Sequence, residues 1–389
     1  MSVKFNQLSN AIRFLSIDAV QKANSGHPGM PMGMADVATV LFKYHLRFNP
    51  KNPNWINRDR FILSAGHGSM LLYSLLYLCG YKSISIDDIK KFRQLNSICA
   101  GHPEYKAGTG IETTTGPLGQ GLGNAVGMAI AEEIYRKKFG STAINNKTYV
   151  IASDGDLMEG ISHEAMSLAG HLKLKNLIVF FDNNKISIDG STSLSVSDNY
   201  KKRFESYGWN FLEINGHNEK QISKAITKVS KSNKPTLVSC KTIIGFGSPN
   251  KSGKASSHGS PLGEEEIALV RKKLKWNNKP FEIPQEILNE WREIGSKGEL
   301  LEKKWHETLN KKNSKIKSDL EKNYLNSNLG NLENLIKKEK TKYFDSKPSL
   351  ATRQCSMAAI ESISTLLPQL IGGSADLSGS NNTKTNNSK

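Results

Sequence analysis

The sequence predicts an α/β fold in which helices cover both faces of a parallel sheet. Over the first three-fifths of the chain, short apolar runs rich in β-branched residues alternate with amphipathic helical stretches. Each run is apolar throughout, which is typical of strands that are buried on both sides. A helix between successive strands is the connection that parallel pairing requires. Together these observations favour a layered α/β domain.

The expected elements follow one another in a regular order. Strands are expected at FILSA (61–65), TYVIAS (148–153), NLIVFFD (176–182) and TLVSCKT (236–242). Amphipathic helices are expected at 5–22, 34–46, 122–138 and 219–231. Several of the strands lead into Gly, Asp, Asn or His residues. Open α/β sheets bind their ligands at these strand ends, so we look there for the site.

Two further segments come after the predicted sheet. Residues 265–345 are rich in Lys, Glu and Asn without strand-like runs, and we expect a mostly helical linker. From Ser349 a helix (ATRQCSMAAIESISTLL), a short strand (QLIGG) and a Gly/Ser/Asn-rich loop begin a second α/β domain. The predicted domains are therefore 1–264, 265–345 and an incomplete 346–389.

Composition narrows the class of protein. Of the 389 residues, 37% are hydrophobic and 23% charged, as in soluble globular proteins. No apolar run reaches the ~18 residues of a membrane span, and the N-terminus does not resemble a signal peptide, so we expect a cytoplasmic protein without a membrane partner. The four cysteines form no CxxC pair. The net charge of +17 comes from dispersed lysines without an aromatic platform, which favours a solvated surface over a nucleic-acid partner.

Two polar segments come directly after successive predicted strands. SDGDLMEG brings Asp154 and Gly155, and FFDNNKIS brings Asn184, to the same edge of the sheet. An Asp-Gly alone is an ordinary turn, but a carboxylate and an amide oxygen together suit Mg²⁺ or Ca²⁺. Gly155 would let the backbone approach a diphosphate, and a helix expected from near Leu157 would direct its free N–H groups at it.

These segments resemble the signature of thiamine-diphosphate enzymes, a GDG followed about thirty residues later by NN. Ser153 replaces the first glycine, and Lys185 stands where that signature often has glycine. The resemblance implies thiamine diphosphate bound with Mg²⁺ or Ca²⁺. It also implies that Asp154, Asn184 and the carbonyl of Ile186 hold the metal.

Four histidines lie in loops rich in Gly, Ser or Pro, where a single histidine is more often structural. The segments are SGHPGMPMG (25–33), SAGHGS (64–69), AGHPE (100–104) with TTTGPLGQGLGNAVGMAIAEE (113–133), and GKASSHGSPLG (253–263). All resemble the transketolase family, SGHPGMPMG most specifically. The glycines of the third segment do not fit G-x-G-x-x-G, so a dinucleotide site is not supported.

The resemblance assigns roles to these segments. It implies that Gly116, Pro117, Leu118 and Gly155 contact the cofactor, and that His67 and His258 contact its diphosphate and thiazolium region. His27, His102 and His258 would face the sugar and act in catalysis. Histidine suits such work because its ordinary pKa lies near neutrality.

The last segment resembles the start of the family's pyrimidine-binding domain. Arg353 and Ser380 match ligands of the substrate phosphate, and Asp376 matches a residue near the cofactor. An arginine suits a phosphate dianion, although Arg353 could also be an ordinary helix-surface residue. The family's glutamate that contacts the aminopyrimidine lies further along this domain. We therefore expect an incomplete chain that is inactive alone.

The resemblance implies a transferase of the pentose phosphate pathway. It would move a two-carbon ketol (glycolaldehyde) unit from a ketose phosphate, such as xylulose 5-phosphate or sedoheptulose 7-phosphate, to an aldose phosphate, such as ribose 5-phosphate or glyceraldehyde 3-phosphate, through a thiamine diphosphate carbanion. A homodimer with active sites at the subunit interface is expected.

Three alternatives remain. Dihydroxyacetone synthase has the same chemistry, and the N-terminal subunit of a split transketolase is weakened by residues 349–389. A non-catalytic basic binding protein is disfavoured by the joint retention of His27, His67, His258, Asp154 and Asn184.

Overall fold

The computed structural model describes residues 3–312, 316–320, 329–367, 369–374, 376–386 and 388. The chain divides into two compact units, 1–308 and 309–389. The domain boundaries expected at 264 and 345 stay a prediction. No helix among the described residues is long and apolar enough to cross a membrane.

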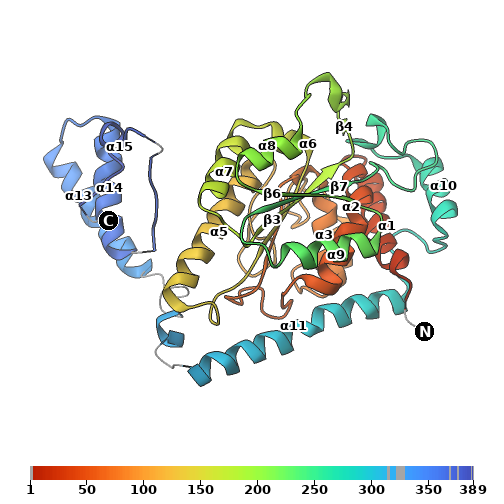
Figure 1. Cartoon of the computed structure of the whole chain (residues 1–389), viewed down its shortest axis with the longest axis horizontal. Helices are drawn as coiled ribbons and strands as arrows, with labels where there is room; N and C mark the ends of the chain where they lie inside the picture. Colours follow the sequence, from red (N-terminus) through yellow and green to blue (C-terminus); the bar gives the residue numbers. More distant parts are fainter. Residues whose placement is uncertain are drawn as a thin grey trace. The chain divides into compact units, whose positions relative to one another are not determined.

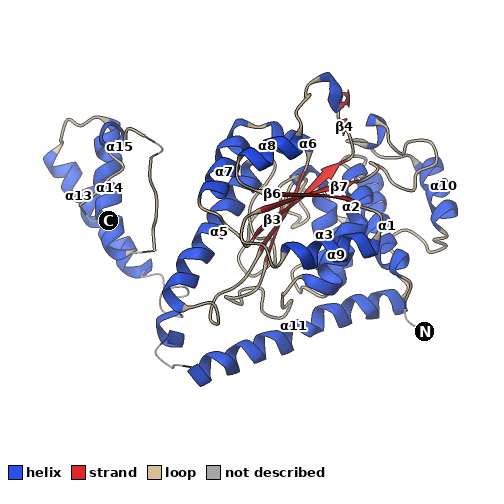
Figure 2. Cartoon of the chain, viewed as in Figure 1, coloured by secondary structure: helices blue, strands red, loops and turns tan. Residues whose placement is uncertain are grey.

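A five-stranded parallel sheet lies at the centre of the first unit, surrounded by helices (Figure 2). The strand order is β1-β2-β3-β7-β6. The strands are β1 (Arg60–Leu63), β2 (Thr148–Ala152), β3 (Leu177–Asn183), β6 (Asn210–Asn215) and β7 (Thr236–Lys241). The four predicted strands are confirmed. The sequence did not reveal β6, because half of the residues of this edge strand are polar and exposed, which interrupts the apolar run.

The helices of the first unit form two layers on the sheet (Figure 1). One layer contains α1 (Phe5–Ala23), α2 (Gly29–Val40), α3 (Ser69–Cys79) and α9 (Glu219–Val229). The other contains α5 (Gln120–Phe139), α7 (Gly160–His171) and α8 (Tyr200–Ser206). The shorter α4 (Ile86–Lys90) packs against α1 and α3, and α10 (Glu264–Leu274) against α1. The predicted α2 begins earlier than residue 34, and a π-helical turn, Leu41–His45, extends it.

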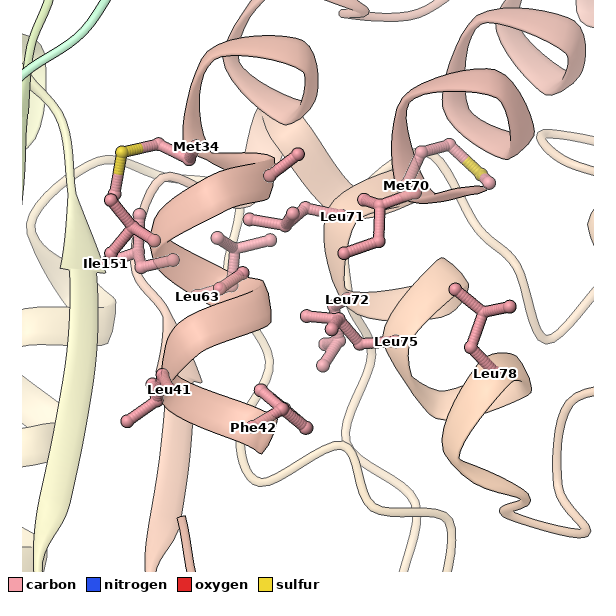
Figure 3. Close-up of a cluster of buried hydrophobic side chains, with 14 of the residues drawn as sticks. Met34, Leu41, Phe42, Leu63, Met70, Leu71, Leu72, Leu75, Leu78 and Ile151 are labelled. Carbon is pink, nitrogen blue, oxygen red and sulfur yellow. The ribbon is translucent and has the colours of Figure 1, made fainter. Parts of the chain in front are cut away.

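Successive side chains of a strand divide between the two layers, as the pleat of a β-strand requires. Tyr149 and Ile151 of β2 join the α1–α2–α3 side, whereas Val150 and Ala152 join the α5–α7 side. Figure 3 shows the first side, where Ile151 and residues of α2 and α3 form one apolar cluster. A sheet buried on both faces explains why the strand sequences are apolar throughout.

Several side chains of helix α11 (Gln285–Lys312) bind other elements of the first unit. Trp291 is fully buried and donates from its indole N–H to the carbonyl of Leu8 at 3.3 Å. Glu302 accepts hydrogen bonds of 2.6 Å from both Asn49 and Asn52. This helix is therefore part of the structure that supports the sheet.

Two glycines let α11 approach the backbone beneath it. A Cβ atom at Gly295 would lie 2.0 Å from the carbonyl oxygen of Cys79. A Cβ atom at Gly298 would lie 1.9 Å from that of Phe48. Neither neighbour is a flexible side chain, so any larger residue would push the helix outward.

The second unit contains α13 (Leu329–Ser346), α14 (Thr352–Leu366) and α15 (Ser378–Asn381), and α13 packs against α14. The helix predicted after Ser349 is confirmed as α14. The strand predicted at QLIGG is wrong, because residues 369–373 form a turn and extended loop. Within the described part of this unit, no other strand offers an edge with which this segment could pair.

Gly298→Ala is expected to lower the free energy of unfolding by about 1–3 kcal/mol, the usual cost of overpacking. The added methyl group would meet the carbonyl of Phe48. Urea unfolding followed by circular dichroism measures the change. Lys297→Ala, at the exposed neighbouring position, is the control and should leave the stability nearly unchanged. Equal stability of both variants would show that α11 is not held closely against the sheet layer.

Candidate active site

The segments that carry the predicted site residues lie after the carboxyl ends of four neighbouring strands. His67 follows β1, Asp154 follows β2 and Asn184 follows β3. His258 lies in the long loop after β7. Because these strands are adjacent and parallel, their ends bring residues far apart in sequence to one edge of the sheet.

Three of the predicted histidines meet in a cluster. The ring centres of His27 and His67 are 5.2 Å apart, and those of His27 and His258 are 5.6 Å apart. The rings of His67 and His258 stack at 5.1 Å. His102 lies close by, since its charge affects the pKa of both His27 and His67. The structure therefore brings together histidines from four separate segments.

The four rings are uncharged at neutral pH. Burial lowers the pKa of His27 to about 4, with further contributions from His258, Arg93 and His102. Burial and the neighbouring histidines lower the pKa of His67 to about 3. The pKa values of His102 and His258 are also lowered, in both cases mainly by burial. A neutral imidazole can donate one hydrogen bond and accept another, which suits contact with hydroxyl groups.

Two glycines of α2 position the loop that carries His258. A Cβ atom at Gly29 would lie 2.4 Å from the carbonyl oxygen of Ser257, and one at Gly33 would lie 3.0 Å from that of Ile243. The N–H of Gly245 donates to the carbonyl of Gly29 at 3.0 Å. These positions explain physically why GMPMG carries a glycine every fourth residue.

A partly buried polar network holds the start of the same loop. The N–H of Ile243 donates to His217 Nε2 at 3.1 Å, so Nδ1 carries the proton that is shared with Asp36 at 2.9 Å. Arg13 donates to the same Asp36 oxygen at 2.6 Å. The ring of Phe246 stacks on His217 with centroids 4.0 Å apart. Nothing in the sequence pattern indicated this network, because its members are distant along the chain.

Asp156 joins three of the site's loops. Its carboxylate accepts from Ser64 Oγ at 2.9 Å and from the N–H of Gly119 at 2.9 Å. It also accepts from Ser153 N at 3.0 Å and Ser153 Oγ at 3.1 Å. With Ser153 it forms a capping box that starts α6 (Asp154–Met158). The helix expected from near Leu157 therefore begins earlier, and the Ser-x-x-Asp spacing was the signal for it.

The candidate metal site contains buried carboxylates. Burial raises the pKa of Asp154 to about 6, although Tyr200, which donates to it at 3.2 Å, and the charge of Lys185 oppose the rise. Burial raises the pKa of Asp182 to about 7, and the charge of Asp154 adds to this. Asn184 donates to Asp182 at 2.8 Å. Negative charge confined in this way is better accommodated beside a cation.

The available donors fit a hard cation. Within the described residues, no three His, Cys, Asp or Glu side chains form a metal-binding group. The predicted donors are instead one carboxylate, one amide oxygen and one backbone carbonyl, which a hard cation prefers. Ile186, at the start of the hairpin β4 (Ile186–Ser187) and β5 (Gly190–Ser191), donates its N–H to Asn184 Oδ1 at 2.9 Å. Lys185 has φ +65°, which explains why glycine would also suit this position.

The surrounding backbone fits a close-lying ligand. Gly116 has φ +152° and lies against His102, to which a Cβ atom would come within 3.4 Å. A Cβ atom at Gly155 would lie 2.8 Å from Leu118. The Nδ1 atoms of His27 and His258 are buried without a hydrogen-bond partner among the described residues. Such atoms are normally satisfied, so they indicate that a ligand completes the site.

The remaining predicted residues belong to the second unit. Arg353 lies in the first turn of α14, Asp376 in a bend and Ser380 in α15, and all three are exposed. No hydrogen bond or ion pair joins them to each other in the described part of this unit. Their roles stay predictions.

In the metal-free protein, Asp154→Asn is expected to increase stability more at pH 8 than at pH 5. A carboxyl whose pKa is raised on folding binds protons more tightly in the folded state, so its cost to stability grows as pH rises through 6. The gain should be about 1 kcal/mol larger at pH 8, from the separation of the two pKa values. Urea unfolding in EDTA at both pH values measures it.

Asp87→Asn is the control, because the Asp87 side chain is 75% exposed. It should change stability equally little at both pH values. If Asp154→Asn increases the free energy of unfolding equally at pH 5 and pH 8, the pKa of Asp154 is not raised by burial in the folded protein.

Known proteins resemble the chain over almost all of its length. The family model described as "Transketolase, thiamine diphosphate binding domain" matches residues 5–330. The transketolase of Buchnera aphidicola subsp. Acyrthosiphon pisum is 55% identical over 384 residues, covering 96% of this chain and 57% of that protein. The transketolase of Rhodobacter capsulatus is 51% identical over 379 residues, covering 97% of this chain and 56% of that protein.

Solved structures agree. The transketolase of Campylobacter jejuni superposes with a TM-score of 0.87 at 44% identity, covering all of this chain and 59% of that one. The Leishmania mexicana transketolase superposes with a TM-score of 0.86 at 38% identity, and the match covers 99% of this chain and 57% of that one. The chain thus spans less than two-thirds of the length of these relatives. On this combination of sequence identity, family match and superposition, the chain belongs to the transketolase family.

Proposed function

We propose that this chain forms the diphosphate-binding side of a transketolase active site. The observation that carries the proposal is the meeting of His27, His67 and His258 at the strand ends that also carry Asp154 and Asn184. Neutral histidines next to a cation-binding edge suit a diphosphate cofactor that is bound beside a separate, reacting sugar. The cytoplasm and the pentose phosphate pathway are the setting that such substrates imply.

Thiamine diphosphate would be held mainly through its diphosphate. Asp154, Asn184 and the carbonyl of Ile186 would bind Mg²⁺ or Ca²⁺, and the metal would bind the diphosphate oxygens. Gly155 allows the close backbone approach that a phosphate requires. When bound, the cofactor supplies the carbon nucleophile that accepts a two-carbon unit and releases it again. The protein's own contribution is to hold and orient the reactants.

Further residues complete the cofactor's surroundings. The loop before α5 contains Gly116, Pro117 and Leu118, which would contact the cofactor. His67 would contact its diphosphate. Asp376 of the second unit would lie near the cofactor, which remains a proposal from family resemblance alone.

The sugar phosphates would be oriented by the remaining polar groups. His27, His102 and His258 would contact hydroxyl groups and the carbonyl, as uncharged rings able both to donate and to accept. They would thereby hold the protons that move between sugar oxygens during transfer of the ketol unit. Arg353 and Ser380 would bind the substrate phosphate.

A homodimer is supported by an apolar surface on α5 and α7. Four large apolar side chains on or directly after these packed helices are exposed by 44–47%: Ile134, Ile161, Leu168 and Leu172. Beside them, Gly123 and Gly127 leave the backbone of α5 open, with no atom within 4 Å of a Cβ at Gly127. Exposed apolar groups gathered in one place mark interaction surfaces, and small residues allow close helix approach. A second copy of the chain is the proposed partner.

Thiamine diphosphate is expected to bind the chain in a manner that requires Mg²⁺. Asp154→Ala should abolish most of this binding, because the metal loses its only carboxylate ligand. Isothermal titration calorimetry with and without Mg²⁺ measures both effects. Asp87→Ala, which removes an exposed carboxylate that is not among the proposed metal or cofactor ligands, is the control and should bind as wild type. Binding that is indifferent to Mg²⁺ and to Asp154 would overturn the metal-bridged site.

Leu168→Glu combined with Ile134→Glu is expected to convert the dimer to a monomer. Each change places a charge in the apolar surface, where burial without a partner is costly. Sedimentation velocity reports the change. Leu300→Glu, at an apolar side chain of α11 that is 54% exposed, is the matched control and should leave the dimer intact. Dimers that persist in the double variant would place the interface elsewhere.

A further inference from the structure

We propose that Arg93 is a positioning residue of the sugar-binding site: its guanidinium links the loop of His27 to the loop of His102 and keeps a fixed positive charge beside both rings. The sequence pattern did not single out Arg93. This inference rests on the proposed function in one respect only, namely that these two histidines face the sugar.

The guanidinium is anchored on the His27 side by Ser25. Arg93 Nη1 donates to Ser25 Oγ at 2.5 Å, two residues before His27. The adjacent Phe92 is buried and contacts the same loop, since a Cβ atom at Gly26 would lie 2.9 Å from Phe92 Cε1. Residues 92 and 93 therefore support the His27 loop together.

On its other side the guanidinium packs against the loop of His102. A Cβ atom at Gly101 would lie 2.9 Å from Arg93 Nε and 3.1 Å from Nη2, so the guanidinium lies directly against Gly101 and would have to shift to admit a larger residue there. Arg93 also donates its backbone N–H to the carbonyl of Cys99 at 2.9 Å. Ser69 Oγ fixes the same loop by donating to the carbonyl of Gly101 at 2.9 Å.

Arg93 occupies an unfavourable backbone conformation to reach this position. Its φ is +62°, in the left-handed region that is unfavourable for a residue with a side chain. Its Nε atom is buried without a hydrogen-bond partner among the described residues. Strain of this kind persists when surrounding structure maintains it, and it is concentrated at functional sites.

The charge of Arg93 acts on both rings in the same direction. Burial lowers the pKa of His27, and the charges of His258, Arg93 and His102 lower it further. Burial and Arg93 lower the pKa of His102. Because a guanidinium carries a positive charge, it adds to the effect of burial in favouring neutral imidazoles, which can accept a hydrogen bond from a sugar hydroxyl.

The test is an NMR titration of histidine-labelled chain without cofactor, from about pH 3 to pH 8, which brackets the pKa of His27. Signals are assigned with His27→Gln and His102→Gln. In Arg93→Gln, which retains hydrogen-bond donors but loses the charge, the pKa values of both His27 and His102 should rise by about half a pH unit or more. In Arg93→Lys, which retains a positive charge, they should stay near the wild-type values.

Two controls distinguish the effect of the Arg93 charge on the histidine pKa values from the effect of any nearby charge or of a change in the whole fold. Lys91→Met removes an exposed positive charge nearby and should not move either pKa. The signal of His306, which contacts Trp305 on α11, should be unchanged in every variant. Unfolding midpoints confirm that each variant is folded, and Arg93→Met replaces Arg93→Gln if the latter is not.

Unchanged pKa values in the charge-free variant would overturn the proposal, and so would an equal rise in Arg93→Lys or Lys91→Met. The measurement does not use thiamine diphosphate. Failure of cofactor binding in calorimetry would therefore count against the proposed function, whereas failure here counts against the role of Arg93.

Discussion

The carboxylate of Asp156 is the interaction on which the arrangement of the site most depends. It accepts hydrogen bonds from Ser64, Gly119 and Ser153, which belong to three different loops and lie up to 92 residues from Asp156 in sequence. These loops lead directly to His67, to the glycine-rich start of α5 and to Asp154. A fully buried carboxylate is costly unless donors surround it, so its position is determined by all three loops at once. The cofactor-binding edge is thus organised by a residue that needs no contact with the cofactor.

Close backbone approach is the second constraint, and it acts on the opposite side of the site. The loop of His258 lies on α2 because Gly29 and Gly33 present no side chain to it. The ring of His217 then fixes where that loop begins through Ile243. Both contacts place His258 relative to His27, which immediately precedes α2. The same segment therefore supplies one of the predicted catalytic histidines and the surface that positions another, which explains the density of glycine in SGHPGMPMG.

The sequence was sufficient for the sheet and for the residues that mark its ligand edge. Four buried strands were readable because continuous apolar runs differ from helical periodicity, and Asp154 and Asn184 could be located from their place after two of these strands. The polar edge strand β6 carried no such signal. Asp156 was readable only through its spacing from Ser153. Arg93 and His217 could not be found, because their roles come from contacts with residues 68 and 181 positions away. Local patterns identify the residues that come directly after a strand, whereas packing decides which residues meet across the site.

Several groups at the site are energetically unfavourable in the protein without its ligands. Asp154 and Asp182 are carboxylates buried side by side, His27 and His258 have buried ring nitrogens without partners among the described residues, and Arg93 adopts a strained backbone. Each costs on the order of 1–3 kcal/mol. A cation and a diphosphate ligand would relieve the first two costs, so ligand binding and folding stability are thermodynamically coupled at this edge. The fold therefore holds these groups in an arrangement that a cation and a diphosphate ligand would complete.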